Sequence, residues 1–275
     1  MEHQGEALAR IAAALERLAP PCPAATDWIA HPAYICSANG ARPVTRIEAP
    51  ALDLLRGIDA QKAAVTANVL RHARGAAAHD MLLWGARGMG KSALLRAAVV
   101  AAQGEEPERL ALVQIGTDAL DSLSGLFARL GAVERRFLVF IDDLGFGEDD
   151  SSGPRRLRSW LDGGVEARPG NVRLAVTANR RAVVSRDMGE QDDPLNPRDV
   201  IDDRLALADR FGLALGFHAC SQDDYLAIVG GYAEAYGLEW DEGDALEWAR
   251  RRGARSGRTA WHYLTELAGR AGRAL

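Results

Sequence analysis

The 275-residue chain is poor in lysine, in cysteine and in aromatic residues. Only two of its 33 basic residues are lysines, Lys62 and Lys91, and the others are arginines. The three cysteines, Cys22, Cys36 and Cys220, are scattered without metal-ligand spacing, which favours a reducing compartment. No apolar run approaches the length of a membrane span and the N-terminus lacks a signal-peptide pattern, so the sequence predicts a cytoplasmic protein with no membrane partner.

The overall composition is that of a soluble globular protein. Hydrophobic residues make up 48% of the chain and charged residues 26%, which is enough to build a large core. At this length we expect two domains, or one domain with extensions. The net charge of −5 argues against a dominant nucleic-acid-binding or membrane-binding surface.

The strongest motif is Gly85-Ala86-Arg87-Gly88-Met89-Gly90-Lys91-Ser92, which fits the phosphate-binding P-loop pattern G-x-x-x-x-G-K-[ST]. It follows an apolar run at 81–84 that predicts a strand, and it precedes a predicted helix at 93–102. The glycines let backbone N–H groups approach a polyphosphate, Lys91 would reach the outer phosphates, and the Ser92 hydroxyl would bind Mg²⁺. A chance glycine-rich turn explains the motif poorly, because one of only two lysines stands where a compact ammonium is needed.

Polar residues follow two further predicted strands. The apolar run Phe137–Ile141 predicts a strand buried on both faces, and it ends in Asp142-Asp143, a Walker B arrangement. Asp142 would hold Mg²⁺ through water, and Asp143 would orient or deprotonate the attacking water. The strand predicted at 172–177 leads to Asn179, whose amide would hydrogen-bond the γ-phosphate or the water. The alternative for the aspartate pair is a polar strand end before a turn.

The periodicity along the chain predicts an α/β fold: a three-layer α/β/α P-loop NTPase with a five-stranded parallel sheet, followed by a small all-helical lid. The strands are expected at 81–84, 110–115, 137–141, 172–177 and 213–217, and the intervening helices at 60–74, 93–102, 118–130 and 200–208. Asp59 is the expected N-cap of the first helix, and Ser221 with Asp224 resembles a capping box. Asp241 and Gly253 are expected to bracket the second helix of the lid, and a third begins near Thr259.

We expect residues 1–50 to form an N-terminal helix and an irregular extension, 51–218 the ATPase core, and 219–275 the lid. The helix predicted at 5–18 packs on the protein's own surface or binds a partner. A long loop is expected at 180–199. Arginines on a short helix at 154–161, and the run Arg250–Arg252, belong to solvated helix faces or contact a polyanion.

The order of these features resembles the AAA+ ATPase superfamily. Its members carry a P-loop, a Walker B motif on the third strand, a polar sensor after the fourth, an arginine before the fifth, and a helical lid. More narrowly, the chain resembles an uncharacterised bacterial family of predicted ATPases, a domain of unknown function. The resemblance covers roughly residues 40–270 and is carried by residues 82–92, 142–144, 177–181, 208–213 and 253–258.

The resemblance implies roles for several residues. Asn179 would be sensor 1, and Ile58 with its neighbours would line the adenine pocket. Most of the superfamily has Asp-Glu in Walker B, whereas this chain has Asp142-Asp143. The second carboxylate is therefore one methylene shorter, which bears on the rate of hydrolysis more than on binding.

The resemblance also implies two functional arginines. Arg210 would be the arginine finger that reaches the ATP bound by the next subunit, and Arg204 competes for that role. Arg258 would be sensor 2 on the lid, with Arg255 as the alternative. A surface ion pair is the plainer explanation for any one of them. A finger acting between subunits implies self-assembly into a ring or spiral.

The function predicted from these features is hydrolysis of ATP with Mg²⁺, coupled to remodelling or loading of a protein partner. Two alternatives remain open: a DNA-associated loader or initiator, and a slow nucleotide-gated binding module. Protein threading is disfavoured, because residues 116–121 contain no aromatic pore-loop residue. Nucleic acid is weakly supported, since nothing after the predicted lid has a helix-turn-helix pattern.

Overall fold

The computed structural model describes residues 26–37, 40–144, 161, 168–179 and 209–275. The elements in chain order are β1 (Ala33–Ser37), β2 (Gly40–Val44), a 3₁₀ turn (Leu52–Leu54), α2 (Asp59–Ala73), β3 (Met81–Gly85), α3 (Lys91–Glu105), β4 (Leu110–Ile115), a 3₁₀ turn (Thr117–Ser122), α4 (Leu123–Gly131), β5 (Arg136–Ile141), β6 (Val172–Ala178), β7 (Leu213–Phe217), α7 (Gln222–Tyr236), α8 (Glu242–Arg251) and α9 (Gly257–Arg270). The helices predicted at 5–18 and 200–208, the loop at 180–199, Arg204 and nearly all of 154–161 lie outside these residues.

The sheet has seven strands, in the order β2-β1-β4-β5-β6-β3-β7, rather than the five predicted. All neighbouring pairs are parallel except β1 with β2, which is antiparallel. The two additional strands come from residues 33–44, which were expected to be irregular. The sequence pattern missed β2 because Gly40 and Pro43 disfavour a strand interior, yet an edge strand tolerates proline.

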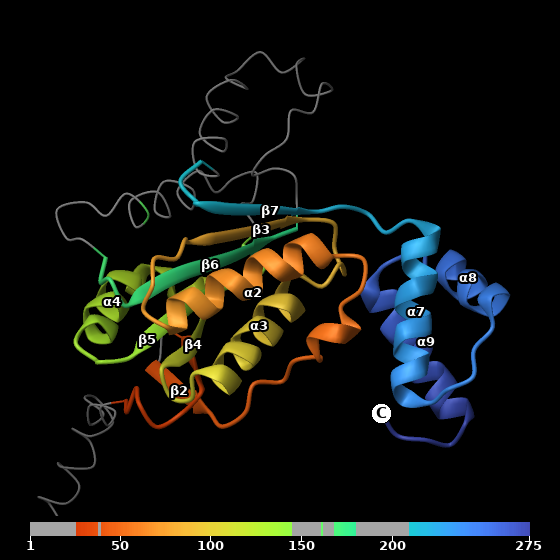
Figure 1. The fold of residues 1–275 in the computed structure, drawn as a ribbon, viewed down its shortest axis with the longest axis horizontal. Coiled ribbons are helices and arrows are strands. Elements are labelled where there is room, and N and C mark those ends of the chain that lie inside the picture. The colour runs from red at the N-terminus through yellow and green to blue at the C-terminus, as the bar shows by residue number, and fades with distance from the viewer. Residues whose placement is uncertain (1–25, 38–39, 145–160, 162–167, 180–208) are drawn as a thin grey trace, which may run out of the picture.

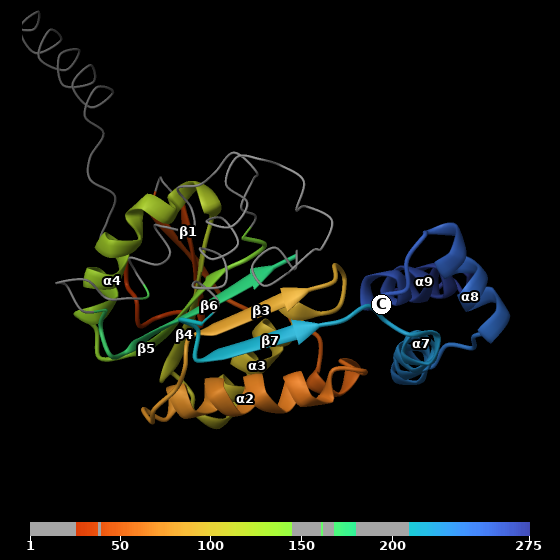
Figure 2. The ribbon, with the colours of Figure 1, turned by 90° about the horizontal axis from the view of Figure 1, so that it is seen from above.

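Helices cover both faces of the sheet. Figures 1 and 2 show α2 and α3 on one face and α4 on the other, with α7, α8 and α9 beyond the carboxyl ends of the strands. Along β5, Leu138 and Phe140 pack into the core under α2 and α3, whereas Phe137, Val139 and Ile141 pack into the core under α4. This strand is therefore buried on both faces, as its continuous apolar run predicted.

The three C-terminal helices begin with side-chain caps, whereas α2, α3 and α4 begin without one. The Ser221–Asp224 capping box at α7 is present, and the Asp241 side chain caps α8 by accepting from the N–H of Asp244. Asp59 is not an N-cap: Ile58 occupies that position without a side-chain cap, and Asp59 is the first helical residue of α2. The carboxylate still lies in the first turn, where it complements the helix dipole.

Other elements differ from the predictions in their bounds. The helix predicted at 118–130 begins as a 3₁₀ turn and becomes α-helical only at Leu123. Helix α9 starts at Gly257 with Ser256 as its cap, slightly earlier than predicted.

Among the described residues, no helix is long and apolar enough to cross a membrane.

Two buried side chains of α2 form hydrogen bonds with the backbone of the sheet that carries the P-loop. Asn68 donates to His79 O and accepts from His79 N, both at 2.9 Å, which fixes the chain just before β3. The His72 ring donates from Nε2 to Phe137 O on β5 at 3.0 Å. Burial lowers the pKa of His72 to about 4, although this hydrogen bond acts in the opposite direction.

Because the pKa of His72 is lowered by burial, we expect the folded protein to lose stability in mild acid. Between pH 6.5 and about 4 the unfolded chain binds a proton at His72 that the folded chain does not, so stability falls as the pH drops through this window. His72→Gln keeps a donor for Phe137 O but removes the titration. In urea unfolding at pH 7.5 and pH 5, wild type should lose about 2 kcal/mol more than the variant. Equal losses would contradict the assignment.

Candidate functional site

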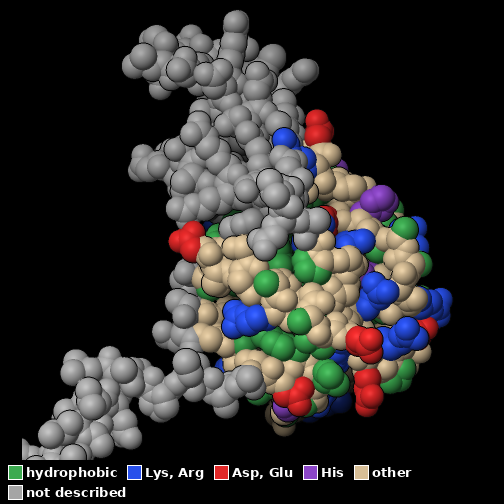
Figure 3. Space-filling model, turned by 90° about the vertical axis from the view of Figure 1, so that its left-hand side faces the viewer, with side chains coloured by type: hydrophobic (Ala, Val, Ile, Leu, Met, Phe, Trp, Pro, Cys, Tyr) green, Lys and Arg blue, Asp and Glu red, His purple; other side chains and the backbone are tan. Residues whose placement is uncertain are grey.

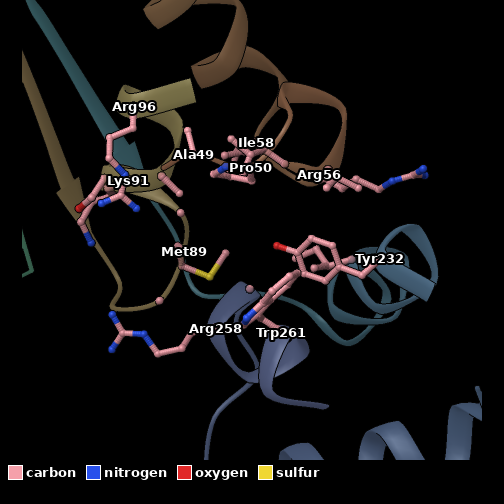
Figure 4. A pocket seen from close by; sticks show the side chains of 18 of the residues that line it. Ala49, Pro50, Arg56, Ile58, Met89, Lys91, Arg96, Tyr232, Arg258 and Trp261 are labelled. Carbon is pink, nitrogen blue, oxygen red and sulfur yellow. The ribbon is translucent and has the colours of Figure 1, made fainter. Parts of the chain in front are cut away.

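A cavity of about 790 Å³ lies at the carboxyl ends of β3, β5 and β6. The P-loop and the start of α3 form one wall, and the segment before α2 forms another. Helices α7 and α9 close the far side (Figure 4). The strands are parallel neighbours, so residues far apart in sequence meet at this edge of the sheet.

The ammonium of Lys91 lies inside the P-loop. Its Nζ donates to Gly85 O at 3.0 Å, to Ala86 O at 2.8 Å and to Asn179 Oδ1 at 3.1 Å, and the residue is 5% exposed. Burial lowers the pKa of Lys91, while the carboxylates of Asp143 and Asp142 oppose that shift. The first turn of α3 begins here, so its free N–H groups face the same space.

Two P-loop glycines are needed for close contacts between elements. A Cβ on Gly85 would lie 2.1 Å from Phe217 O of β7, which also accepts from Ala86 N at 2.8 Å. A Cβ on Gly88 would lie 2.8 Å from Ser256 Oγ, and Gly88 has φ +74°. Because these glycines carry no side chain, β7 and the start of α9 can approach the loop. The P-loop motif by itself does not predict these two contacts.

A chain of hydrogen bonds surrounds Asp142. Its Oδ1 accepts from Ser92 Oγ at 2.5 Å and from Thr177 Oγ1 at 2.7 Å. Thr177 Oγ1 in turn accepts from the backbone N–H of Asp143 at 2.8 Å. The P-loop helix and the ends of β5 and β6 are thus joined through one carboxylate oxygen.

Asn179 lies between the P-loop and the aspartate pair. Its Oδ1 accepts from Lys91 Nζ, and its Nδ2 donates to Asp143 Oδ1. Asp143 has a left-handed backbone, with φ +51°. Aspartate is among the residues that tolerate this region best, whereas a longer glutamate is less suited to it. The backbone conformation gives a physical reason for Asp-Asp in place of Asp-Glu.

The other end of the cavity is mainly apolar and aromatic. Ile58 and Pro50 stand on one side, Tyr232 and Trp261 on the other, and Met89 lies between them (Figure 4). Tyr232 and Trp261 meet edge to face, with their ring centroids 5.5 Å apart. Such a slot has the shape and chemistry that receive a planar heterocycle.

The structure brings most predicted site residues together. Gly88 to Ser92, Ile58, Asp142, Asp143, Asn179 and Arg258 all line the cavity. Gly85, Ala86 and Arg87 form the first part of the loop and lie outside the lining. Arg255 is also absent from the lining, and its neighbour Arg258 donates its backbone N–H to Gly88 O at 3.2 Å.

Arg210 lies near the amino ends of the strands, which is the end of the sheet opposite the cavity. It precedes β7, whose first residue, Leu213, pairs with Met81, and whose last, Phe217, pairs with Gly85. The length of the strand, about 17 Å, thus separates Arg210 from the P-loop of its own chain. A role for Arg210 in ATP hydrolysis requires the site of another subunit.

Sequence reasoning missed several residues of the site. Thr177 was assigned to a strand and to a segment that carries the family resemblance, without a role of its own, and residues 48–50 were assigned to an extension without chemistry. Arg96 lines the cavity from α3, and its Nε is buried without a hydrogen-bond partner among the described residues. Tyr232 and Trp261 carry no motif. A search for polar residues at strand ends would have found Thr177, but the others become visible only in the folded chain.

The donor set fits Mg²⁺ bound together with a polyphosphate. The hydroxyl of Ser92 and the carboxylate of Asp142 are hard oxygen donors, which Mg²⁺ prefers. Within the described part of the chain, no group of three or more His, Cys, Asp and Glu side chains could hold a metal. The remaining ligands would therefore be phosphate oxygens and water, as is usual for Mg²⁺ in nucleotide sites.

The strand order, the P-loop after β3 and the aspartate pair after β5 are those of an AAA+-type P-loop fold. The chain belongs to the family described as "Protein of unknown function (DUF815)", whose model matches residues 29–271. A comparison with curated proteins gave no match.

Solved structures share the fold at low sequence identity. The Holliday junction branch migration motor RuvB of Thermotoga maritima has a TM-score of 0.52 at 17% identity, over 81% of this chain and 66% of that one. The ORC1 protein of Aeropyrum pernix, solved in complex with DNA, has a TM-score of 0.56 at 16% identity, over 82% of this chain and 66% of that one. The chain therefore spans just under two thirds of the length of each.

The contact between Gly88 and α9 predicts the effect of a single methyl group. Gly88→Ala forces a left-handed alanine against Ser256, which costs about 1–2 kcal/mol. We expect the melting temperature to fall by about 4 °C and α9 to move from the loop. Gly104→Ala is the matched control, because nothing lies within 4 Å of its added Cβ. Equal melting temperatures for the two variants would contradict the contact.

Proposed function

We propose that this protein is a Mg²⁺-dependent ATPase that binds ATP between the P-loop and the C-terminal helices. The single observation that supports this most is the meeting of Lys91, the Ser92–Asp142 pair and the Asn179–Asp143 pair in one cavity. The cavity also has an apolar end of the kind that receives a base. A phosphate-only site would not need that end.

In this proposal each group has one task. Lys91 and the N–H groups at the start of α3 hold the β- and γ-phosphates, and the aromatic and apolar end holds the adenine beside Ile58. Ser92 and Asp142 would hold Mg²⁺, which when bound neutralises charge on the phosphates. Asp143 orients the attacking water or accepts its proton, and Asn179 holds Asp143. Arg258 contributes positive charge from the start of α9.

We further propose that the protein works as a homo-oligomer, a ring or a spiral, in which Arg210 serves the site of the next subunit. The position of Arg210 near the amino ends of the strands, away from the cavity of its own chain, supports this proposal. The C-terminal helices, expected as a lid at 219–275, would transmit a change at the loop through the Gly88–α9 contact. Work on an unknown protein client, in the cytoplasm, remains the first proposal for what the energy drives.

A DNA-associated role is the second candidate, and the fold of the two DNA-related neighbours favours it. The charge of this chain weighs against it. At the end of the molecule opposite the C-terminal helices, the described surface carries basic and acidic side chains side by side rather than a continuous basic patch (Figure 3). Stimulation of turnover by single-stranded DNA would favour this candidate over a protein client.

The two lysines of the chain allow a matched test of ATP binding. Lys91→Ala and Lys91→Arg should each weaken ATP binding at least about tenfold, because a buried ammonium is lost or replaced by a larger planar group. Lys62→Arg makes the same change outside the cavity lining and should leave binding unchanged. Asp143→Asn should bind ATP normally but hydrolyse it about 100-fold more slowly. Normal ATP binding by Lys91→Ala would overturn the proposal.

A mixing experiment tests the role of Arg210. Arg210→Ala subunits, which keep the nucleotide site, are mixed with Asp143→Asn subunits, which keep the arginine, and ATP turnover is measured. If the arginine acts between subunits, the mixture regains turnover that neither variant shows alone, because some interfaces pair an intact site with an intact finger. Arg109→Ala, an exposed arginine before β4 at the amino ends of the strands, is the control for loss of a surface charge and should keep its own turnover. A mixture as inactive as its two components would remove the support for an intersubunit finger.

A further inference from the structure

We propose that Thr177 is a positioning residue that sets the geometry of the aspartate pair, and through it the affinity of the site for Mg²⁺ with nucleotide. This inference rests on the proposed ATPase function and deepens it. The side chain is 1% exposed, yet its hydroxyl is joined to both aspartates. Thr177 belongs to β6, so the residue acts from a different strand than the pair it holds.

The directions of the hydrogen bonds follow from the chemistry of each group. The backbone N–H of Asp143 can only donate, so Thr177 Oγ1 accepts from it at 2.8 Å. The single hydroxyl hydrogen of Thr177 is then donated to Asp142 Oδ1 at 2.7 Å. The hydroxyl is thereby held in one defined orientation, with its hydrogen donated and one of its two lone pairs accepting.

Thr177 and Ser92 both donate to the same oxygen of Asp142. The two bonds to Oδ1 fix the plane of the carboxylate. Among the described residues Oδ2 of Asp142 has no hydrogen-bond partner, so this oxygen would be the one available to hold Mg²⁺, directly or through water. With one hydroxyl removed, the carboxylate could rotate about its side-chain torsion and exchange the two oxygens.

Thr177 also holds the backbone beyond β5. Its hydroxyl accepts from the N–H of Asp143, and its carbonyl accepts from the N–H of Leu144 at 2.8 Å. Between these bonds the chain passes through the left-handed conformation of Asp143. Such a conformation persists when its surroundings hold it. This turn directs the Asp143 carboxylate to Asn179, so the same threonine orders the second acidic group.

The test compares Thr177→Val, which keeps the shape and removes the hydroxyl, with Thr177→Ser, which keeps the hydroxyl. The binding of a fluorescent ADP analogue is measured first in EDTA and then across Mg²⁺ concentrations, and ATP turnover is measured separately. For Thr177→Val we expect unchanged binding of the analogue in EDTA. The Mg²⁺ concentration required for half of the maximal strengthening of binding should rise about tenfold, and turnover should be slower. Thr177→Ser should behave like wild type.

Thr66→Val is the matched control, since the Thr66 hydroxyl is buried without a hydrogen-bond partner among the described residues. It should change neither the Mg²⁺ dependence nor turnover. Asp142→Asn alone and combined with Thr177→Val completes a double-mutant cycle. If Thr177 acts through Asp142, the second change adds little to the first.

The outcomes separate this inference from the proposed function. Wild type that binds no nucleotide, or binds it independently of Mg²⁺, overturns both. If wild type behaves as proposed but Thr177→Val differs from it by less than twofold in Mg²⁺ dependence and in turnover, only the role of Thr177 is overturned. Melting curves without nucleotide show whether Thr177→Val is folded, and if it is not, Thr177→Ala carries the same comparison against Thr177→Ser.

Discussion

The site depends on one constraint of the sheet, which is that β6 lies between β5 and β3. This order places Thr177 and Asn179, near the end of β6, between the aspartates that follow β5 and the P-loop that follows β3. Thr177 joins the aspartates to one another, and Asn179 joins Asp143 to Lys91. Three segments distant in sequence are thereby held in one hydrogen-bonded network, and a change at any of them is felt by the others.

The second structural condition is the close contact between the P-loop and the C-terminal helices. Gly88 accepts the backbone N–H of Arg258, and it leaves no room for a side chain beside Ser256. The same loop also touches β7 through Gly85. The loop that would hold phosphate is therefore packed against both the sheet and α9. A shift of the loop by a fraction of an ångström would reach α9 directly, because packed interfaces transmit strain.

Much of the fold could be predicted from local pattern, and the rest required contacts between distant residues. The continuous apolar run of β5 and the P-loop motif indicated a buried strand and a phosphate site without knowledge of neighbours. β2 was missed because Pro43 disfavours a strand until the strand is known to lie at an edge. Thr177 could be noticed only as a polar residue at a strand end, because its role depends on the register between β5 and β6. Tyr232 and Trp261 reach the cavity only through the packing of α7 on α9.

The most direct test of the central claim is the steady-state ATPase rate of wild type measured over a wide range of protein concentration, with Mg²⁺ and saturating ATP. If the site binds and hydrolyses ATP and is completed by a neighbouring subunit, the rate per subunit rises with protein concentration and reaches a plateau as the oligomer forms. Absence of turnover at every concentration would contradict hydrolysis. A rate per subunit that stays constant over the range in which the oligomer forms would contradict the shared site.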